Sequence, residues 1–372
     1  MVRTACAKSC RRQTGIGMNP NGQRADVTMC QNHRPARRMH RAGDKRIVRA
    51  LPPLFPLLRT TTRVVFLDDD VRYLQMLSIA IPERFAASLY SAGVEAANDL
   101  QASLAHLARE RSGLAGIAAD GEKSVVLALR YLHDPSRFFI AGVLGCDYAM
   151  PDEAGTAFCA KHAISGLRRI LLTGSADTEV AVGAFNEGAI ELYMPKQASN
   201  PLEKLIVNVD SQMLRSAAER GAVLAAAIPP QTQSLLEDRQ LEPALTRFIE
   251  KLGVVEYVFL GRPLGLIAVD KNGSVLWIQL EDEPSLRGLV EILTESGWNR
   301  EEIDLVRDRK AAVDVEVASQ LPGHEPRIEP LQQLCAAPYL GAAVFALDAL
   351  PDALAPAQHR SWRIENAGAR LK

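Results

Sequence analysis

The sequence predicts an α/β fold: a doubly wound parallel sheet of five strands, followed by a smaller α+β domain. Between residues 62 and 228, short apolar runs alternate with segments whose apolar residues recur at helical spacing. Strands that alternate with helices in this way build a parallel sheet covered on both faces. Farther along the chain, Asn272 and Gly273 separate two apolar runs, a pattern typical of a hairpin between antiparallel strands.

Five runs are predicted as strands of the parallel sheet. They are VVFL (64–67), AASLY (86–90), FFIAGVLGC (138–146), RILLT (169–173) and IELYM (190–194). The third run is apolar throughout, as expected for a strand that is buried on both faces. An amphipathic segment follows each strand, and the last of these, at roughly 200–227, predicts a long helix that closes the unit.

The first 61 residues form a basic extension that we expect to be disordered, because they lack any hydrophobic period. Residues 1–60 contain 13 Lys or Arg against only Asp26 and Asp44, whereas the whole 372-residue chain has a net charge of -1. The rest of the chain is therefore acidic, which argues against binding to nucleic acid. Translation could also begin at Met18, Met29 or Met39.

Composition also bears on the compartment. The six cysteines show no disulfide-like spacing, which fits a reducing environment. No run approaches the roughly 18 apolar residues that span a bilayer. The expected location is the cytoplasm, without a membrane partner.

Polar residues gather at the carboxyl ends of the predicted strands. Asp68, Asp69 and Asp70 follow the first strand, Asp147 follows the third, Thr173 ends the fourth, and Lys196 lies just past the fifth. Functional groups converge at this edge of a parallel sheet. Crowded carboxylates need a counter-charge, which a hard cation such as Mg²⁺ supplies. A carboxylate beside a metal ion, a hydroxyl and an ammonium group is suited to phosphoryl transfer.

Residues 63–228 resemble the receiver domain of two-component response regulators, the CheY-like family. The resemblance rests on four motifs in the right order: VVFLDDD (64–70), DYAMP (147–151) with Gly155 after it, LLTGSAD (171–177) and LYMPK (192–196). It implies a flavodoxin-like strand order of 2-1-3-4-5. It also implies a phosphoprotein that receives its phosphoryl group from a sensor histidine kinase or phosphotransfer protein, and not an enzyme beyond slow self-phosphorylation and dephosphorylation.

The resemblance assigns a role to each residue of the site. It implies that Asp147 is the phosphoacceptor and that Lys196 pairs with Asp147 or its phosphate. It also implies that Thr173 and Tyr193 form the switch. The Mg²⁺ ligands that it implies are Asp68, Asp69, Asp147 and the backbone carbonyl of Ala149.

Two features depart from the family pattern. The spacing of 79 residues between Asp68 and Asp147 exceeds what the family uses, and the excess predicts an extended second helix or a helical insertion at about 100–137. Pro195 precedes Lys196, where many receivers place a proline after the lysine.

Residues 234–372, after a predicted linker at 228–233, are expected to form the output domain. Strands are predicted at 255–261, 264–270, 274–280, near 313–317 and at 341–346, with helices at about 283–297 and 300–311. No helix-turn-helix with a basic recognition helix is present, so we expect output through a protein partner or a ligand that the sequence does not identify. The long closing helix carries Leu202, Ile206, Val209 and Met213 at seam-like spacing, and could pair with a second copy or pack on its own sheet.

Three other functions remain open at this point. A Mg²⁺-dependent phosphohydrolase of the haloacid-dehalogenase type would use Asp68 as nucleophile with Asp70, Thr173 and Lys196, but leaves DYAMP unexplained. A transcription factor would bind DNA through the basic N-terminal tail. A scaffold with a receiver fold would never become phosphorylated, although it would not need the matched polar groups.

Overall fold

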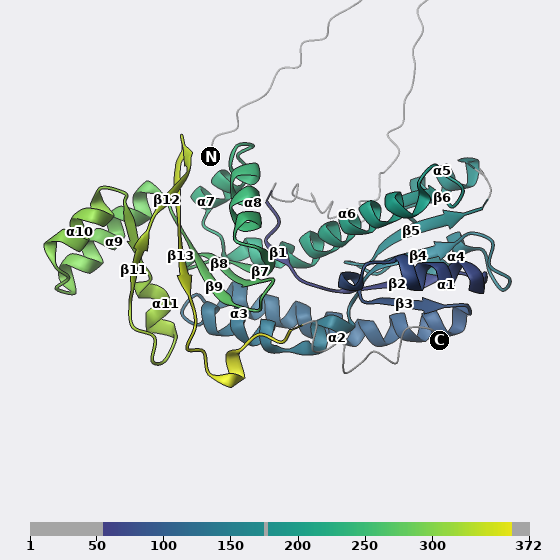
Figure 1. Cartoon of the computed structure of the whole chain (residues 1–372), viewed down its shortest axis with the longest axis horizontal. Coiled ribbons are helices and arrows are strands. Elements are labelled where there is room, and N and C mark those ends of the chain that lie inside the picture. The colour runs from purple at the N-terminus through teal and green to yellow at the C-terminus, as the bar shows by residue number, and fades with distance from the viewer. Residues whose placement is uncertain (1–54, 175–177, 359–372) are drawn as a thin grey trace, which may run out of the picture. The chain divides into compact units, whose positions relative to one another are not determined.

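A five-stranded parallel sheet forms the first half of the fold, in the order β3-β2-β4-β5-β6 (Figure 1). The computed structural model describes residues 55–174 and 178–358. The strands are β2 (Arg63–Leu67), β3 (Ala87–Tyr90), β4 (Ala141–Asp147), β5 (Arg168–Thr173) and β6 (Leu192–Pro195). All neighbouring pairs are parallel. The predicted five strands and their order, 2-1-3-4-5, are therefore confirmed.

Helices cover both faces of this sheet. They are α1 (Val71–Ala80), α2 (Gly93–Ala119), α4 (Gly155–Lys161), α5 (Thr178–Asn186) and α6 (Pro201–Gly221), with a 3-10 turn η1 at Glu83–Phe85. Residues of α1 and α6, such as Leu77 and Val209, pack on Val64 and Phe66 on one face. Residues of α2, α4 and α5 pack on the opposite face. The alternate strand residues thus fill two separate layers of core.

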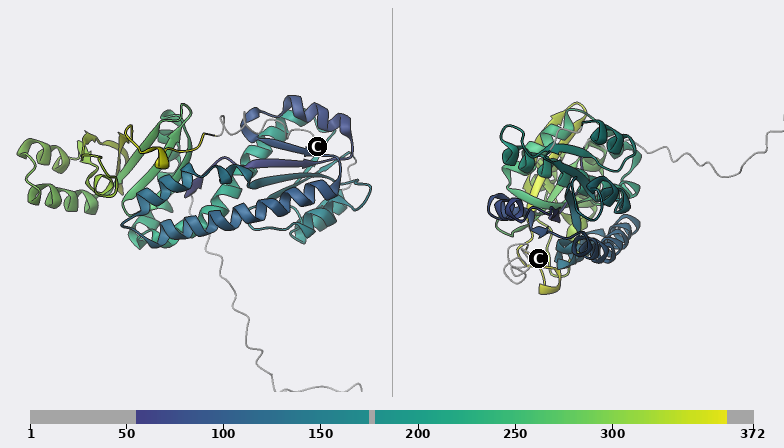
Figure 2. Two further views of the ribbon diagram at one scale, coloured as in Figure 1. Left: turned by 90° about the horizontal axis from the view of Figure 1, so that it is seen from below. Right: turned by 90° about the vertical axis from the view of Figure 1, so that its right-hand side faces the viewer.

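The long spacing between the first and third strands is taken up by helix. The second helix continues for 27 residues as α2, and α3 (Ser124–His133) and the 3-10 turn η2 (Pro135–Phe139) follow it. The third strand therefore begins at Ala141, later than the predicted residue 138, because Pro135–Phe139 is a 3-10 turn whose N-cap is Asp134. Figure 2 shows α2 as the long helix that runs from the parallel sheet to the second sheet.

An antiparallel sheet forms the core of the second half, in the order β1-β7-β8-β9-β13-β12. Its strands are β1 (Leu58–Arg59), β7 (Val254–Gly261), β8 (Leu264–Asp270), β9 (Val275–Glu281), β12 (Gln332–Ala336) and β13 (Tyr339–Ala346). The predicted hairpin at Asn272-Gly273 joins β8 to β9, and Gly273 has the positive φ of 89° that this turn requires. The edge strand β1 comes from the segment that precedes the parallel sheet and pairs with β7, so strands from both sides of the parallel sheet in the sequence belong to one antiparallel sheet.

Helices and a small ribbon complete this half. They are η3 (Ala222–Ala227), α7 (Pro230–Leu236), α8 (Leu241–Lys251), α9 (Glu283–Glu295), α10 (Arg300–Arg307), β10 (Ala311–Val313), α11 (Val315–Gln320), β11 (Ile328–Pro330) and η4 (Asp352–Leu354). One prediction was wrong here: the strand expected near 313–317 ends at Val313 and gives way to α11. Residues 230–233 of the expected linker are helical, because Pro230 begins α7 at a position that tolerates proline.

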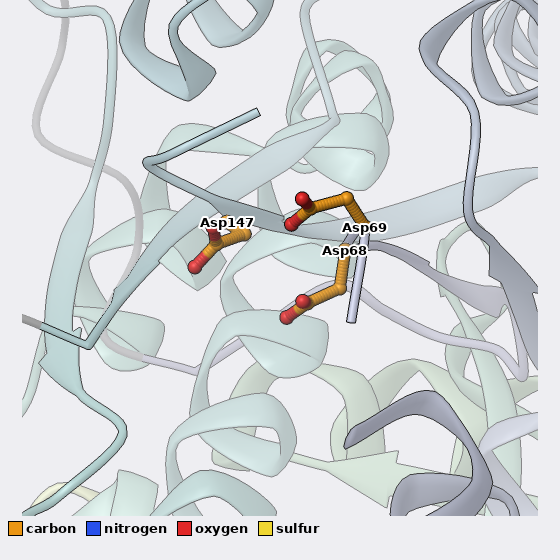
Figure 3. A group of neighbouring side chains, drawn as sticks. All are labelled: Asp68, Asp69 and Asp147. Carbon is orange, nitrogen blue, oxygen red and sulfur yellow. The ribbon is translucent and has the colours of Figure 1, made fainter. Parts of the chain in front are cut away.

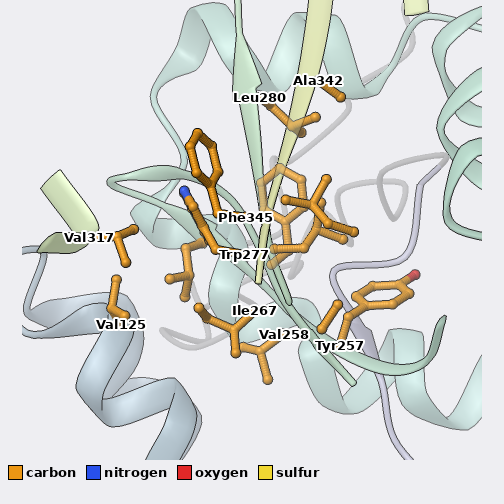
Figure 4. Packing of buried hydrophobic residues seen from close by; sticks show 14 of the residues in the cluster. Val125, Tyr257, Val258, Ile267, Trp277, Leu280, Val317, Ala342 and Phe345 are labelled. Carbon is orange, nitrogen blue, oxygen red and sulfur yellow. The ribbon is translucent and has the colours of Figure 1, made fainter. Parts of the chain in front are cut away.

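One hydrophobic cluster joins the helical insertion to the antiparallel sheet. Leu114 and Ile117 near the end of α2, and Val125 and Leu129 of α3, are buried in the same cluster as Trp277. Figure 4 shows Val125 and Val317 beside this sheet, and the backbone N–H of Val125 donates to Gln320 of α11 over 3.0 Å. The insertion is therefore part of the core of the second half.

The N-terminal extension predicted to be disordered lies, up to residue 54, outside the described residues. Within the described part of the chain, none of the helices combines the length and the apolar composition that crossing a membrane requires.

Candidate functional site

Three carboxylates meet at the carboxyl edge of the parallel sheet. Asp68 and Asp69 follow β2, and Asp147 is the last residue of β4. One oxygen from each lies within 4.8 Å of the others, and Figure 3 shows the three side chains gathered at this edge. Asp68 and Asp147 are 1% and 4% exposed, whereas Asp69 is exposed. The cluster is thus open to solvent on the side of Asp69.

Lys196 joins two of these carboxylates. Its ammonium nitrogen lies 2.6 Å from Asp68 Oδ2 and 2.7 Å from Asp147 Oδ1. The backbone N–H of Lys196 donates to the carbonyl of Thr173 over 2.7 Å, which fixes the lysine at the end of β6 beside β5. Pro195 ahead of the lysine therefore leaves the ammonium group within reach of the site.

The second oxygen of Asp147 is held by the backbone. The N–H of Ala149 donates to Asp147 Oδ2 over 2.9 Å. The loop is then closed by a hydrogen bond from the N–H of Gly155 to the carbonyl of Tyr148, 2.9 Å. A Cβ atom on Gly155 would lie 1.9 Å from the carbonyl oxygen of Asp147, so only glycine allows helix α4 to begin this close to the strand end.

Asp70 has a different role from its neighbours. Its carboxylate accepts hydrogen bonds from the backbone N–H groups of Arg72 and Tyr73, 2.9 and 3.3 Å, as the N-cap of α1. This capping satisfies amide groups that the first turn of a helix leaves unpaired. The side chain of Asp70 is not part of the acidic cluster found among the described residues.

The two switch residues predicted from the sequence lie on the adjoining strands. Thr173 is the last residue of β5 and is buried, and β5 pairs with β4 so that Leu172 stands opposite Asp147. Tyr193 lies on β6, opposite Leu171, and is half-buried against the core of α2, α4 and α5. Their roles as a switch remain predictions, as does the binding of Mg²⁺ by the carbonyl of Ala149.

Burial and charge act against each other at this site. Burial raises the pKa of Asp68 above its usual value, and the ammonium group of Lys196 offsets only part of that rise. Burial alone would lower the pKa of Lys196, but its hydrogen bonds to Asp147 and Asp68 and their negative charges outweigh burial and raise it. Lys196 is therefore firmly protonated.

The donor set fits a hard divalent cation. Three carboxylates and one ammonium group leave a formal charge of -2 at the site. Carboxylate oxygens near an open, solvent-facing side are the ligands that Mg²⁺ prefers, because it keeps several waters when bound. The observed cluster contains Asp68, Asp69 and Asp147, the same side chains that the sequence predicts as metal ligands.

Sequence reasoning missed one neighbour of the site. The ammonium group of Lys196 lies 4.6 Å from the centre of the Tyr73 ring, a cation–π contact. Tyr73 lies in the first turn of α1, three residues after the Asp70 cap. That spacing places the ring beside the acidic strand end and could have identified it.

No protein-family model and no curated protein matches the sequence. Among solved structures, the Legionella pneumophila response regulator LqsR is similar at 18% sequence identity, with a TM-score of 0.65, over 85% of this chain and 97% of that one. Receiver domain proteins from Methanospirillum hungatei JF-1 and Clostridium thermocellum each match at 17% identity over 42% of this chain, and over 97% and 96% of their own, with TM-scores of 0.28 and 0.29. The likeness to LqsR shows that the two chains share a fold.

Proposed function

We propose that the protein is a cytoplasmic response regulator that accepts a phosphoryl group on Asp147 and signals through its second half. The observation that carries the proposal is the arrangement around Asp147. Its carboxylate is held by Lys196 on one oxygen and by the N–H of Ala149 on the other, beside two further carboxylates. This arrangement holds the Asp147 carboxylate beside an ammonium group and beside two carboxylates that could bind a divalent cation. Fixed positive charges of this kind stabilise the negative charge that develops in phosphoryl transfer.

In the proposed reaction, a carboxylate oxygen of Asp147 forms a bond to phosphorus. The phosphorus–nitrogen bond of a phosphohistidine donor breaks, and its electron pair returns to the donor. Lys196 would then pair with the new phosphoryl oxygens in place of the Asp147 carboxylate, while Asp68 keeps the ammonium group in position. A bound Mg²⁺ ion would neutralise the negative charge that gathers on the phosphoryl oxygens.

The alternative phosphohydrolase would need Asp68 as nucleophile and Asp70 as its partner. The role of Asp70 disfavours it, because Asp70 caps α1 and its side chain lies outside the acidic cluster. Asp68 and Asp147 do not differ in burial or in their pairing with Lys196. Without Asp70 as a partner for Asp68, the nucleophile that we favour is Asp147.

Acetyl phosphate with Mg²⁺ tests the proposal on the full chain by intact mass spectrometry. We expect one added phosphoryl group on the parent protein and none on Asp147→Asn. The matched control is Asp70→Asn, which alters a cap outside the acidic cluster and should still be modified. EDTA should prevent modification of every variant.

Steady release of phosphate that persists in Asp147→Asn and stops in Asp68→Asn would overturn the proposal in favour of hydrolysis. Equal modification of the parent and Asp147→Asn would also count against it, since it would place the phosphoryl group elsewhere.

A further inference from the structure

A cavity of about 230 Å³ lies in the second half of the molecule, between helix α9, strand β9 and the β10–α11 segment. Its walls are mostly apolar, and include Leu264, Leu289, Ile292, Val313 and Val315. An empty cavity of about 150 Å³ holds a benzene molecule, so this one has room for a ligand with a ring-sized body. It is remote from Asp147 in sequence and shares none of the residues of the acidic site.

One wall of the cavity carries a buried carboxylate. Glu281, at the end of β9, is 5% exposed and lines the cavity. Gln279 Nε2 donates to Glu281 Oε1 over 2.6 Å and also to the carbonyl of Val313 over 3.1 Å, so both amide hydrogens are used. Trp277 Nε1 donates to Gln279 Oε1 over 3.0 Å, which fixes the orientation of that amide.

A carboxylate has about four lone-pair sites for hydrogen bonds. Among the described residues, the amide of Gln279 donates to Glu281 Oε1, and the nearby hydroxyl of Ser285 donates to the backbone carbonyl of Asp282. The second oxygen therefore has capacity for a donor from the cavity. A cation is the most favourable occupant, because a buried carboxylate is costly without a positive partner.

Helix α9 contributes a notch to the same cavity. Gly288 lies in the middle of the helix and lines the cavity, and a Cβ atom there would meet nothing within 4 Å. Glycine is unfavourable inside a helix relative to alanine, and neither a positive φ nor a close neighbour requires it here. The missing side chain leaves open space in the cavity that Glu281 also lines.

An exposed residue of the lining adds a second negative charge. Glu316, in the first turn of α11, is exposed and lines the cavity, as does the exposed Ile292. The negative charge of Glu316 would also favour a cation in this cavity.

We propose that this cavity binds a small organic cation, an ammonium or amidinium group on an apolar body about the size of a benzene ring. The charged end pairs with Glu281, and the apolar body lies in the notch at Gly288 against Leu289 and Val313. The proposal goes beyond phosphorylation at Asp147, since it makes the second half a ligand-binding domain.

Calorimetric titration of the full chain with benzylammonium chloride tests the proposal. We expect saturable binding by the parent protein at pH 8, and binding about 10- to 100-fold weaker for Glu281→Gln, because a hydrogen bond to a charged group is lost. Gly288→Leu fills the notch and should abolish binding with Glu281 intact. The matched control, Glu295→Gln, removes an exposed charge from the same helix and should bind like the parent.

One neutral analogue and one anionic analogue of the ligand separate the role of charge from that of shape. Benzyl alcohol should bind at least about 10-fold more weakly than benzylammonium, and benzoate not at all. A cooperative thermal unfolding transition would show that a variant is folded. If Glu281→Gln does not fold, the affinity of Gly288→Leu still tests whether the ligand binds in this cavity.

Three results would overturn the proposal. The first is the absence of saturable benzylammonium binding by the folded parent, which would indicate a cavity that holds only water. The second is an affinity for benzyl alcohol equal to that for benzylammonium. The third is an affinity of Gly288→Leu for benzylammonium equal to that of the parent. None of them bears on Asp147, so the response-regulator proposal and this one fail independently.

Discussion

At the scale of single residues, the geometry of Asp147 depends on a neighbour without a side chain. The carbonyl oxygen of Asp147 occupies the space that a Cβ of residue 155 would need, and the loop between them brings the Ala149 N–H to the carboxylate. The orientation of the proposed phosphoacceptor is therefore set by backbone packing as well as by Lys196.

Gly155→Ala should lower the free energy of unfolding by about 2–3 kcal/mol, because overpacking forces the backbone to move. It should also reduce modification by acetyl phosphate. Urea unfolding and intact mass measure the two effects. The control is Gly183→Ala in α5, where a Cβ meets nothing within 4 Å and the substitution should stabilise by about 0.5–1 kcal/mol. Equal stability of the two variants would contradict this account of Gly155.

The stability of the protein should depend on pH through the buried carboxyl group of Glu281. Burial raises the pKa of Glu281 from 4.5 to about 7, although the hydrogen bonds of Ser285 and Gln279 lower it; Glu316 of α11 and the adjacent Asp282 raise it further. Between pH 4.5 and about 7, the folded protein therefore binds more protons than the unfolded chain does. The free energy of unfolding consequently falls as pH rises through this range. The loss amounts to roughly 3 kcal/mol.

Glu281→Gln should remove that part of the pH dependence, since the amide does not titrate. In urea unfolding at pH 5 and pH 8, we expect the variant to gain stability relative to the parent as pH rises. A constant difference between the two proteins would show that Glu281 does not titrate in this range.

At the scale of elements, a buried ion pair connects α2 to α6. Arg220 of α6 pairs with Glu110 of α2 and donates to Thr60 over 3.3 Å, and the Tyr131 hydroxyl of α3 donates to Glu110 over 2.6 Å. All four residues are buried. Three helices and the chain that leads into β2 thus meet at one polar centre.

Breaking this pair should cost about 3–5 kcal/mol, because either single change leaves a buried charge without its partner. We expect this loss in urea unfolding for Glu110→Leu and for Arg220→Met, and a smaller loss in the double variant. The exposed pair Arg84–Asp210 is the control, and Arg84→Met should cost about 1 kcal/mol or less. Single variants as stable as the control would show that the polar centre contributes little.

At the scale of the whole molecule, the two sheets share elements. The segment before β2 supplies the edge strand β1 of the antiparallel sheet, and Arg137, just ahead of β4, forms a buried pair with Glu256 of β7 at 2.9 Å. Glu256 also accepts the backbone N–H of Thr61 over 2.7 Å. The proposed receiver half and the proposed output half are therefore connected by more than a single linker.

A fragment limited to residues 62–228 should lose order in its insertion. The end of α2 and all of α3 pack against the antiparallel sheet, and without it Leu114, Val125 and Leu129 would be exposed to water. We expect amides of residues 110–137 to exchange hydrogen much faster in the fragment than in the full chain, with little change in β2 and β4. Unchanged exchange across 110–137 would show that the receiver folds with its insertion alone.

Local signals were enough to predict the parallel sheet and the acidic cluster. Apolar runs followed by Asp68 and Asp147 specify both a strand and the polar group at its end, so the position of the side chains follows from the topology. Burial partners from distant segments are not visible in this way. The contact of Lys196 with the Tyr73 ring, the pairing of Leu58 with Val258 and the switch from β10 to α11 depend on packing across the fold, which a single sequence does not display.

The length of α2 has a consequence for how this architecture can vary. Ala96 and Leu100 near its start belong to the core of the parallel sheet, whereas Leu114 and Ile117 near its end belong to the core of the other sheet. Each residue inserted between these two faces would turn the second by about 100° relative to the first. Seven residues, close to two full turns, would restore the phase to within about 20°. Relatives with this arrangement should therefore differ in the length of the helix by close to whole numbers of turns, such as about 7, 11 or 18 residues. A single-residue insertion should disturb the packing between the two halves while leaving the residues of the acidic site in place.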